Sequence, residues 1–178
     1  LASKMRALRT HGIIREGIDP GKLAREPWIY EQISLGYNYR LNDISAALGI
    51  SQLSKLDHFI AERNKVAAEY KKNLSGLDLR LQNWDYPAVN SYHLFVVRFR
   101  DESLRLRAYE EFRAEGFLVN VHYVPIYHHP YYRETGFAGF SLPNTELYYS
   151  QALSLPCFVG VEGETLNKVT EMLAAIAA

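Results

Sequence analysis

Two short segments of the sequence combine aromatic rings with polar groups beyond what a hydrophobic core requires. The first is Gly36-Tyr-Asn-Tyr-Arg40, and the second is Val121-His-Tyr-Val-Pro-Ile-Tyr-His-His-Pro-Tyr-Tyr-Arg133. Aromatic side chains with a few polar groups beside them are typical of a pocket for a ring-containing ligand. The two segments therefore predict a binding site for a small molecule.

The second segment also places His122, His128 and His129 close together in the sequence. Histidine is a frequent zinc ligand, but no Cys or Asp lies near these three, and their spacing matches no standard zinc pattern. The sequence therefore favours a site without a metal ion. It also offers no Gly-rich phosphate loop, and no Ser/His/Asp set for nucleophilic catalysis follows from spacing.

A long helix is predicted directly after the first segment. Asn42 is a suitable N-cap, and residues 43–74 contain no proline and only one glycine. Ile44, Leu48 and Phe59 belong to an apolar stripe with helical spacing. A helix of this length commonly connects two domains.

The remaining elements surround the second segment. Strands are predicted at 91–100 and 117–125, because both runs are rich in aromatic and β-branched residues. An amphipathic helix is predicted between them, at 103–115, and further helices at 144–152 and 164–177. This order indicates an α+β layer with helices on one side of a sheet.

Composition excludes several classes of partner. The 178 residues include 20 Lys and Arg against 20 Asp and Glu, so the chain has no overall attraction to nucleic acid or to an anionic membrane. No apolar run reaches the roughly 18 residues of a membrane span. The single cysteine, Cys157, excludes an internal disulfide and stands in an apolar setting that indicates packing. We therefore expect a cytoplasmic protein that binds neither nucleic acid nor membranes.

Five landmarks follow one another in the order of a known family. They are Arg9-Thr-His-Gly12, Gly36-Tyr-Asn-Tyr-Arg40 with the helix that follows it, Ser91-Tyr-His-Leu-Phe95, Val121-His-Tyr-Val-Pro125 and Leu153-Ser-Leu-Pro-Cys-Phe158. With them, essentially the whole chain resembles the DegT/StrS family of sugar aminotransferases, which use pyridoxal 5′-phosphate (PLP). The segment around 129–149 is similar to a subgroup on the route to pseudaminic acid, although Tyr127 stands where that subgroup usually has His.

The resemblance implies the fold type I, aspartate-aminotransferase-like architecture. Residues 1–41 would then be the end of the large PLP-binding domain with an interface loop. Residues 42–74 would form a long connecting helix that bridges the domains, and residues 75–178 a small C-terminal α+β domain. The lysine that binds the cofactor covalently is expected upstream of Leu1, so no catalytic residue is expected within the chain.

The resemblance also assigns binding residues. Asn38 matches an asparagine that reaches across a dimer interface to the partner's cofactor phosphate, where an amide donates a hydrogen bond without adding charge. An ordinary turn residue is the alternative for Asn38, and a strand end that simply packs is the alternative for the second segment. The residues expected to contact the nucleotide sugar are Tyr37, Arg40, His122, Tyr123, Val124 and Pro125.

The implied reaction transfers an amino group from L-glutamate to a 4-keto-6-deoxy nucleotide sugar, in a homodimer whose sites are shared across the interface. Two alternatives remain open. A sugar 3-dehydratase of the same family has His in place of the cofactor-binding lysine, and a catalytically inactive homologue would serve as a binding or regulatory module. The residue at the lysine position distinguishes the three.

Overall fold

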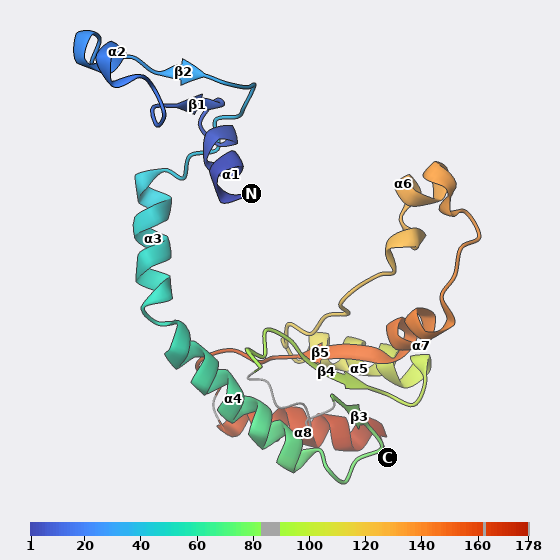
Figure 1. The fold of residues 1–178 in the computed structure, drawn as a ribbon. Coiled ribbons are helices and arrows are strands. Elements are labelled where there is room, and N and C mark those ends of the chain that lie inside the picture. Colours follow the sequence, from blue (N-terminus) through green and yellow to red (C-terminus); the bar gives the residue numbers. More distant parts are fainter. Residues whose placement is uncertain (83–89, 162, 178) are drawn as a thin grey trace. The chain divides into compact units, whose positions relative to one another are not determined.

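The computed structural model describes residues 1–82, 90–161 and 163–177, and Figure 1 shows their path. The chain divides into two compact units, Leu1–Ser54 and Lys55–Ala178. The first predicted ligand segment belongs to the first unit and the second segment to the second unit. Each unit is described by itself.

The first unit is built from short elements with little buried apolar surface. Helix α1 (Ala2–Leu8) is followed by β1 (Ile13–Ile14), α2 (Pro20–Arg25) and β2 (Glu31–Gln32). Strands β1 and β2 pair antiparallel. Ala7 and Ile18 are its buried hydrophobic side chains. Backbone hydrogen bonds, rather than a large core, therefore fix the local geometry of this unit.

The residues predicted as one helix, 43–74, form two helices in the structure. Helix α3 (Asp43–Leu53) begins as predicted, because the Asn42 side chain accepts a hydrogen bond from the Ser45 amide at 2.8 Å. It ends at Leu53, and α4 (Leu56–Asn73) begins after a break. At the break the Ser54 hydroxyl donates to the Ser51 carbonyl at 2.9 Å, a local bond that competes with helical hydrogen bonding. No residue of α3 is buried, although its sequence is largely apolar.

The second unit contains a sheet in the order β3-β4-β5, and both pairings are antiparallel. Its strands are β3 (Arg80–Leu81), β4 (Phe95–Arg98) and β5 (Ala152–Leu155). Strand β4 lies inside the predicted strand at 91–100. The sheet register places Phe95 opposite Leu155.

The predicted strand at 117–125 is wrong. Only Asn120 pairs with the sheet, through an isolated bridge to Ser154, and the Asn120 side chain accepts a hydrogen bond from the next amide in the chain at 2.9 Å. The strand that occupies this part of the sheet is β5, which sequence patterns did not predict because α7 (Pro143–Gln151) runs into it without a turn residue.

Helices cover the sheet and complete the core. Helix α5 (Glu102–Ala114) and helix α8 (Gly163–Ala177) lie close to the predicted bounds, and α8 contacts both α4 and α5 (Figure 1). Between α5 and α7 the chain forms η1 (Ile126–His128), α6 (Pro130–Tyr132) and η2 (Arg133–Phe137). The fully buried large side chains include Tyr70, Phe95, Phe99, Phe112, Leu153 and Leu173. The unit is a mixed α+β layer, as predicted.

Candidate functional site

The loop that carries Asn38 is held by two glycines in close contact. A Cβ built on Gly36 would lie 2.3 Å from the Gly12 amide nitrogen and 2.8 Å from the Leu8 carbonyl oxygen. Gly12 has a φ of +72°, and a Cβ there would lie 2.0 Å from the Ser34 carbonyl oxygen. Because the obstructing atoms are backbone, neither position accepts a side chain without moving the chain.

Hydrogen bonds fix the same loop against the end of α1. The Tyr37 amide donates to the Leu8 carbonyl at 2.6 Å, and the Tyr37 carbonyl accepts from the His11 amide at 2.8 Å. The Tyr39 amide donates to the Arg9 carbonyl at 2.9 Å. The rings of Tyr37 and Tyr39 are stacked, with centroids 4.8 Å apart. The sequence Gly36-Tyr-Asn-Tyr-Arg40 is therefore a fixed loop that presents its side chains outward.

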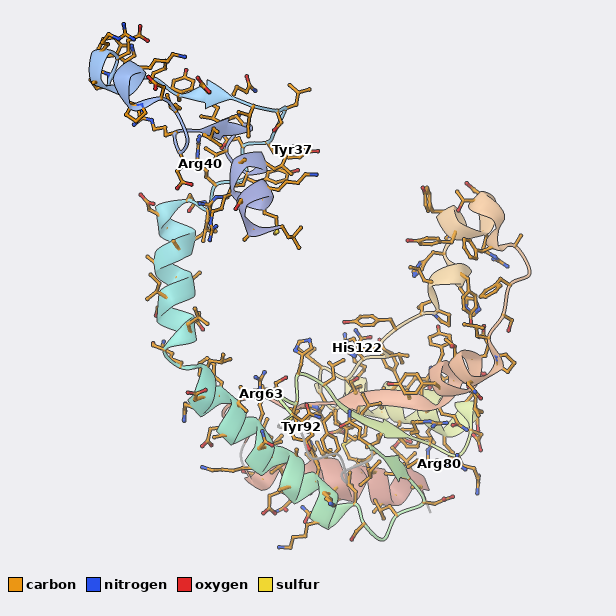
Figure 2. The ribbon with its side chains drawn as sticks, in the orientation of Figure 1. Tyr37, Arg40, Arg63, Arg80, Tyr92 and His122 are labelled. Carbon is orange, nitrogen blue, oxygen red and sulfur yellow. The ribbon has the colours of Figure 1, made fainter. Side chains whose placement is uncertain are left out.

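The three residues predicted here for binding all lie at the surface of the first unit. Asn38 forms an isolated bridge with Thr10 and is exposed, and Arg40 is exposed as well. Tyr37 is 57% exposed, and Figure 2 shows its side chain and that of Arg40 on either side of α1 in this view. The loop thus offers an amide, a phenol and a guanidinium to a ligand.

The predicted residues of the second segment lie in the second unit. His122 is partly buried, and its Nδ1 lies 2.8 Å from the Ser154 hydroxyl oxygen on β5. The His122 and Tyr123 rings are perpendicular, with centroids 4.7 Å apart. Tyr123 is 70% exposed and Val124 is 41% exposed, whereas Pro125 is buried. The structure therefore fixes His122 and leaves Tyr123 open to a ligand.

His122 lines a cavity of about 660 Å³ that lies wholly within the second unit. Of the residues predicted for binding it is the one that reaches this cavity; the others in its segment do not line it. Arg63 of α4 and His93 also line it, and sequence analysis assigned neither. His93 belongs to the predicted strand at 91–100 but lies before β4, and it is exposed.

Periodicity alone could have found Arg63. It lies three and four positions before the buried residues Val66 and Ala67, so it continues the core-facing side of α4 with a charged group. A charged residue at a position where helical periodicity requires an apolar one indicates a functional or strained site at that position. His93 carries no comparable signal in the sequence.

Cys157 also lines the cavity, and it is buried as predicted. Burial raises the pKa of its thiol to about 11. The group is therefore protonated at neutral pH and lacks the thiolate that nucleophilic chemistry requires. Its role is packing.

His128 of the second segment has a different partner. His128 Nε2 lies 2.9 Å from a Glu146 carboxylate oxygen on α7. Tyr127, which stands where the resembled subgroup usually has His, packs perpendicular to Phe140 and accepts a hydrogen bond from the Leu142 amide at 3.3 Å. Within the described part of the chain, no group of three or more His, Cys, Asp or Glu side chains could hold a metal ion. No helix of that part is long and apolar enough to span a membrane.

The sequence profile of the DegT/DnrJ/EryC1/StrS aminotransferase family matches residues 1–174. The chain belongs to this family. The match includes both ligand segments, the glycine contact and the cavity. It supports the resemblance seen in the five ordered landmarks.

Three solved structures share the fold. Helicobacter pylori PseC, an aminotransferase involved in the biosynthesis of pseudoaminic acid, is 25% identical over 98% of this chain with a TM-score of 0.83. S. venezuelae DesV is 29% identical over 99% of the chain with a TM-score of 0.79. Spr1654 from Streptococcus pneumoniae in its PLP form is 21% identical over 98% with a TM-score of 0.83, which shows the fold alone. The chain spans 45%, 44% and 43% of these three proteins.

The residues of the first loop fit the phosphate of PLP. An exposed amide on a fixed loop can donate to a phosphate oxygen, and the neighbouring guanidinium can form a second, charge-assisted bond. The fit depends on Gly12 and Gly36, because their close contact, together with the backbone hydrogen bonds of Tyr37 and Tyr39, holds Asn38 in its observed place. Asn38 therefore meets the chemical requirement that the family resemblance sets.

Proposed function

We propose that the protein containing this chain is a PLP-dependent aminotransferase that moves an amino group from L-glutamate to a 4-keto-6-deoxy UDP-sugar. The observation that carries the proposal is the family match over residues 1–174. The likeness to PseC and the pattern around residues 121–149 favour the product UDP-4-amino-4,6-dideoxy-N-acetyl-β-L-altrosamine, a step towards pseudaminic acid.

Bound PLP supplies an electron-withdrawing ring for the proton transfers of transamination. In the proposal, the Asn38 amide donates a hydrogen bond to the cofactor phosphate of a partner protomer. Arg40 adds a charged donor near that phosphate or near the diphosphate of the sugar. The fixed loop contributes by keeping both groups in place before binding, so that little conformational freedom is lost when the ligand arrives.

The second segment binds the nucleotide sugar in this proposal. Tyr123 presents a largely exposed ring that can stack on a sugar or base and a hydroxyl that can hydrogen-bond. His122 is oriented by its contact with Ser154, at 2.8 Å. Pro125 is buried and anchors the segment, and Val124 adds apolar contact beside it.

Transfer of labelled nitrogen tests the activity. The whole protein is incubated with PLP, ¹⁵N-L-glutamate and the 4-keto UDP-sugar, and the nucleotide sugar is analysed by mass spectrometry. The proposal requires an amino sugar that contains ¹⁵N and an equal amount of 2-oxoglutarate. Unlabelled glutamate provides the matched control for the mass shift.

The same assay separates the alternatives. A sugar 3-dehydratase would give a product that has lost water and gained no nitrogen. An inactive homologue would leave the nucleotide sugar unchanged under conditions in which an authentic aminotransferase of the family converts it. Either result refutes the proposed function.

A further inference from the structure

Arg63 places a positive charge on the side of α4 that faces the core. The next turns of the same side carry Val66, Ala67 and Tyr70, all of them buried. The Arg63 Nε is itself buried and has no hydrogen-bond partner among the described residues. Leaving a buried polar group unpaired is unfavourable, so the Arg63 side chain is a candidate to bind a group from outside the described residues.

The cavity beside Arg63 suits an anion. His93, His122 and Asn120 also line it, and no Asp or Glu is among the described residues of its lining. Arg63 therefore meets no competing carboxylate among the described residues that line the cavity. Figure 2 shows Arg63 and His122 on the same part of the second unit, away from Arg80.

Most of the remaining lining is apolar, apart from Ser154 and Thr165, and suits the body of an organic molecule. Phe117, Leu118, Pro156 and Phe158 contribute to its walls. A volume of about 660 Å³ is within the range of small-molecule pockets. Inorganic ions would leave most of this space and its apolar walls without contact.

Hydrogen bonds between distant segments fix the cavity walls. The Tyr70 hydroxyl donates to the Pro156 carbonyl at 3.0 Å, and the Cys157 thiol lies 3.8 Å from the Arg63 carbonyl oxygen. The Asn64 side-chain Nδ2 donates to the Asn90 carbonyl at 2.9 Å, which holds the segment leading to His93. The site is therefore formed before any ligand binds.

We propose that this cavity binds an organic anion, with a phosphate or carboxylate group on Arg63 and an apolar or ring-shaped body against the phenylalanine-lined wall. A planar guanidinium binds either group through paired hydrogen bonds. The proposal rests on the proposed function only for the natural source of the anion, which is the phosphate of the nucleotide sugar or the carboxylate of the amino donor. Binding itself needs neither turnover nor PLP, so the two proposals can fail separately.

The test titrates the ¹⁵N-labelled chain with UMP, which carries a phosphate, and separately with L-glutamate, which carries carboxylates. Backbone and side-chain NMR signals are followed over the millimolar range. We expect saturable shifts at Arg63 and His122 with one of the two probes, and the probe that binds identifies the source. Arg63→Gln removes the charge and should weaken that binding roughly tenfold to a hundredfold.

Two further variants make the result specific. Arg80→Gln removes an exposed arginine of the same unit and should bind as the wild type does. Arg63→Lys keeps the charge without the planar fork and should bind between the wild type and Arg63→Gln; it also replaces Arg63→Gln if the latter loses the wild-type spectrum. Absence of saturable shifts with both probes overturns the proposal, as does equal binding by Arg63→Gln and Arg80→Gln.

Discussion

Replacing Gly36 by Ala tests the claim that a glycine contact holds the Asn38 loop. The added Cβ would lie 2.3 Å from the Gly12 amide nitrogen and 2.6 Å from the His11 carbonyl carbon. Both are backbone atoms, so the loop must move away from the end of α1. The φ of Gly36 is not positive, so the effect comes from the steric contact and not from the conformational preference of alanine.

The size of the effect follows from the bonds beside Gly36. Displacement breaks or lengthens the Tyr37–Leu8 and His11–Tyr37 hydrogen bonds, at 2.6 Å and 2.8 Å. Each such bond contributes about 0.5–1.5 kcal/mol, so we expect the loop to lose about 1–3 kcal/mol of local stability. The free energy of opening then falls enough to accelerate exchange of the Tyr37 and His11 amide protons roughly fivefold to a hundredfold.

Hydrogen exchange measured by NMR provides the assay, and Gly49→Ala provides the control. Gly49 lies within α3 and a Cβ there meets nothing within 4 Å, so alanine should stabilise that helix by about 0.5–1 kcal/mol. Unchanged exchange of the Tyr37 and His11 amides in Gly36→Ala would show that the loop is held by something other than the contact described here.

Three further predictions concern binding and pH. Asn38→Ala in the whole protein should weaken PLP retention roughly tenfold to a hundredfold, measured by dialysis and absorbance, because one hydrogen bond to a charged phosphate is lost; unchanged retention would remove Asn38 from the cofactor site. Tyr123→Ala should raise KM for the nucleotide sugar and leave the half-reaction with glutamate near normal, measured by stopped flow; equal slowing of both half-reactions would assign the residue to folding or cofactor support. Unfolding of the chain in urea should show a loss of stability as the pH rises from 9 to 11, because the buried Cys157 thiol has its pKa raised from 9.0 to about 11 and keeps its proton in the folded state after the unfolded state has lost it. Cys157→Ala should make this alkaline loss smaller. An identical alkaline loss in Cys157→Ala would show that other groups, such as the buried Tyr70 with its raised pKa, account for it.

Local signals in the sequence predicted α5, α7, α8 and the start of α3. Asn42 caps α3 as its side chain suggested, and α5 and α8 lie within a residue of the predicted bounds. These elements depend on caps and on apolar spacing within one segment, which the sequence displays directly. The break at Ser54 was not predicted, because it depends on one serine bonding to the backbone of its own helix.

Features that depend on contacts between residues far apart in the chain could not be predicted from the sequence in this way. The run 117–125 has strand composition, yet β5 meets it only at the Asn120–Ser154 bridge, and β5 itself follows α7 without a turn residue. A segment rich in strand-forming residues suits a half-buried surface. Its composition does not show whether it will pair with another strand, or with which one. The cavity was not predicted for the same reason, because Arg63 and His93 both line it and are brought to the same place only by folding.

The bonds that fix the cavity walls also determine when that cavity can first exist during synthesis. The Cys157 thiol meets the carbonyl of Arg63, 94 positions earlier, and the Tyr70 hydroxyl meets the Pro156 carbonyl, 86 positions later. At typical translation rates the two sides leave the ribosome roughly 5 to 20 s apart. The buried side of α4 therefore stays uncovered until β5 and the Pro156–Cys157 segment that follows it have been synthesised. A ligand of the cavity cannot guide the early steps of folding, and its effect falls on the finished unit, whose unfolded population it reduces.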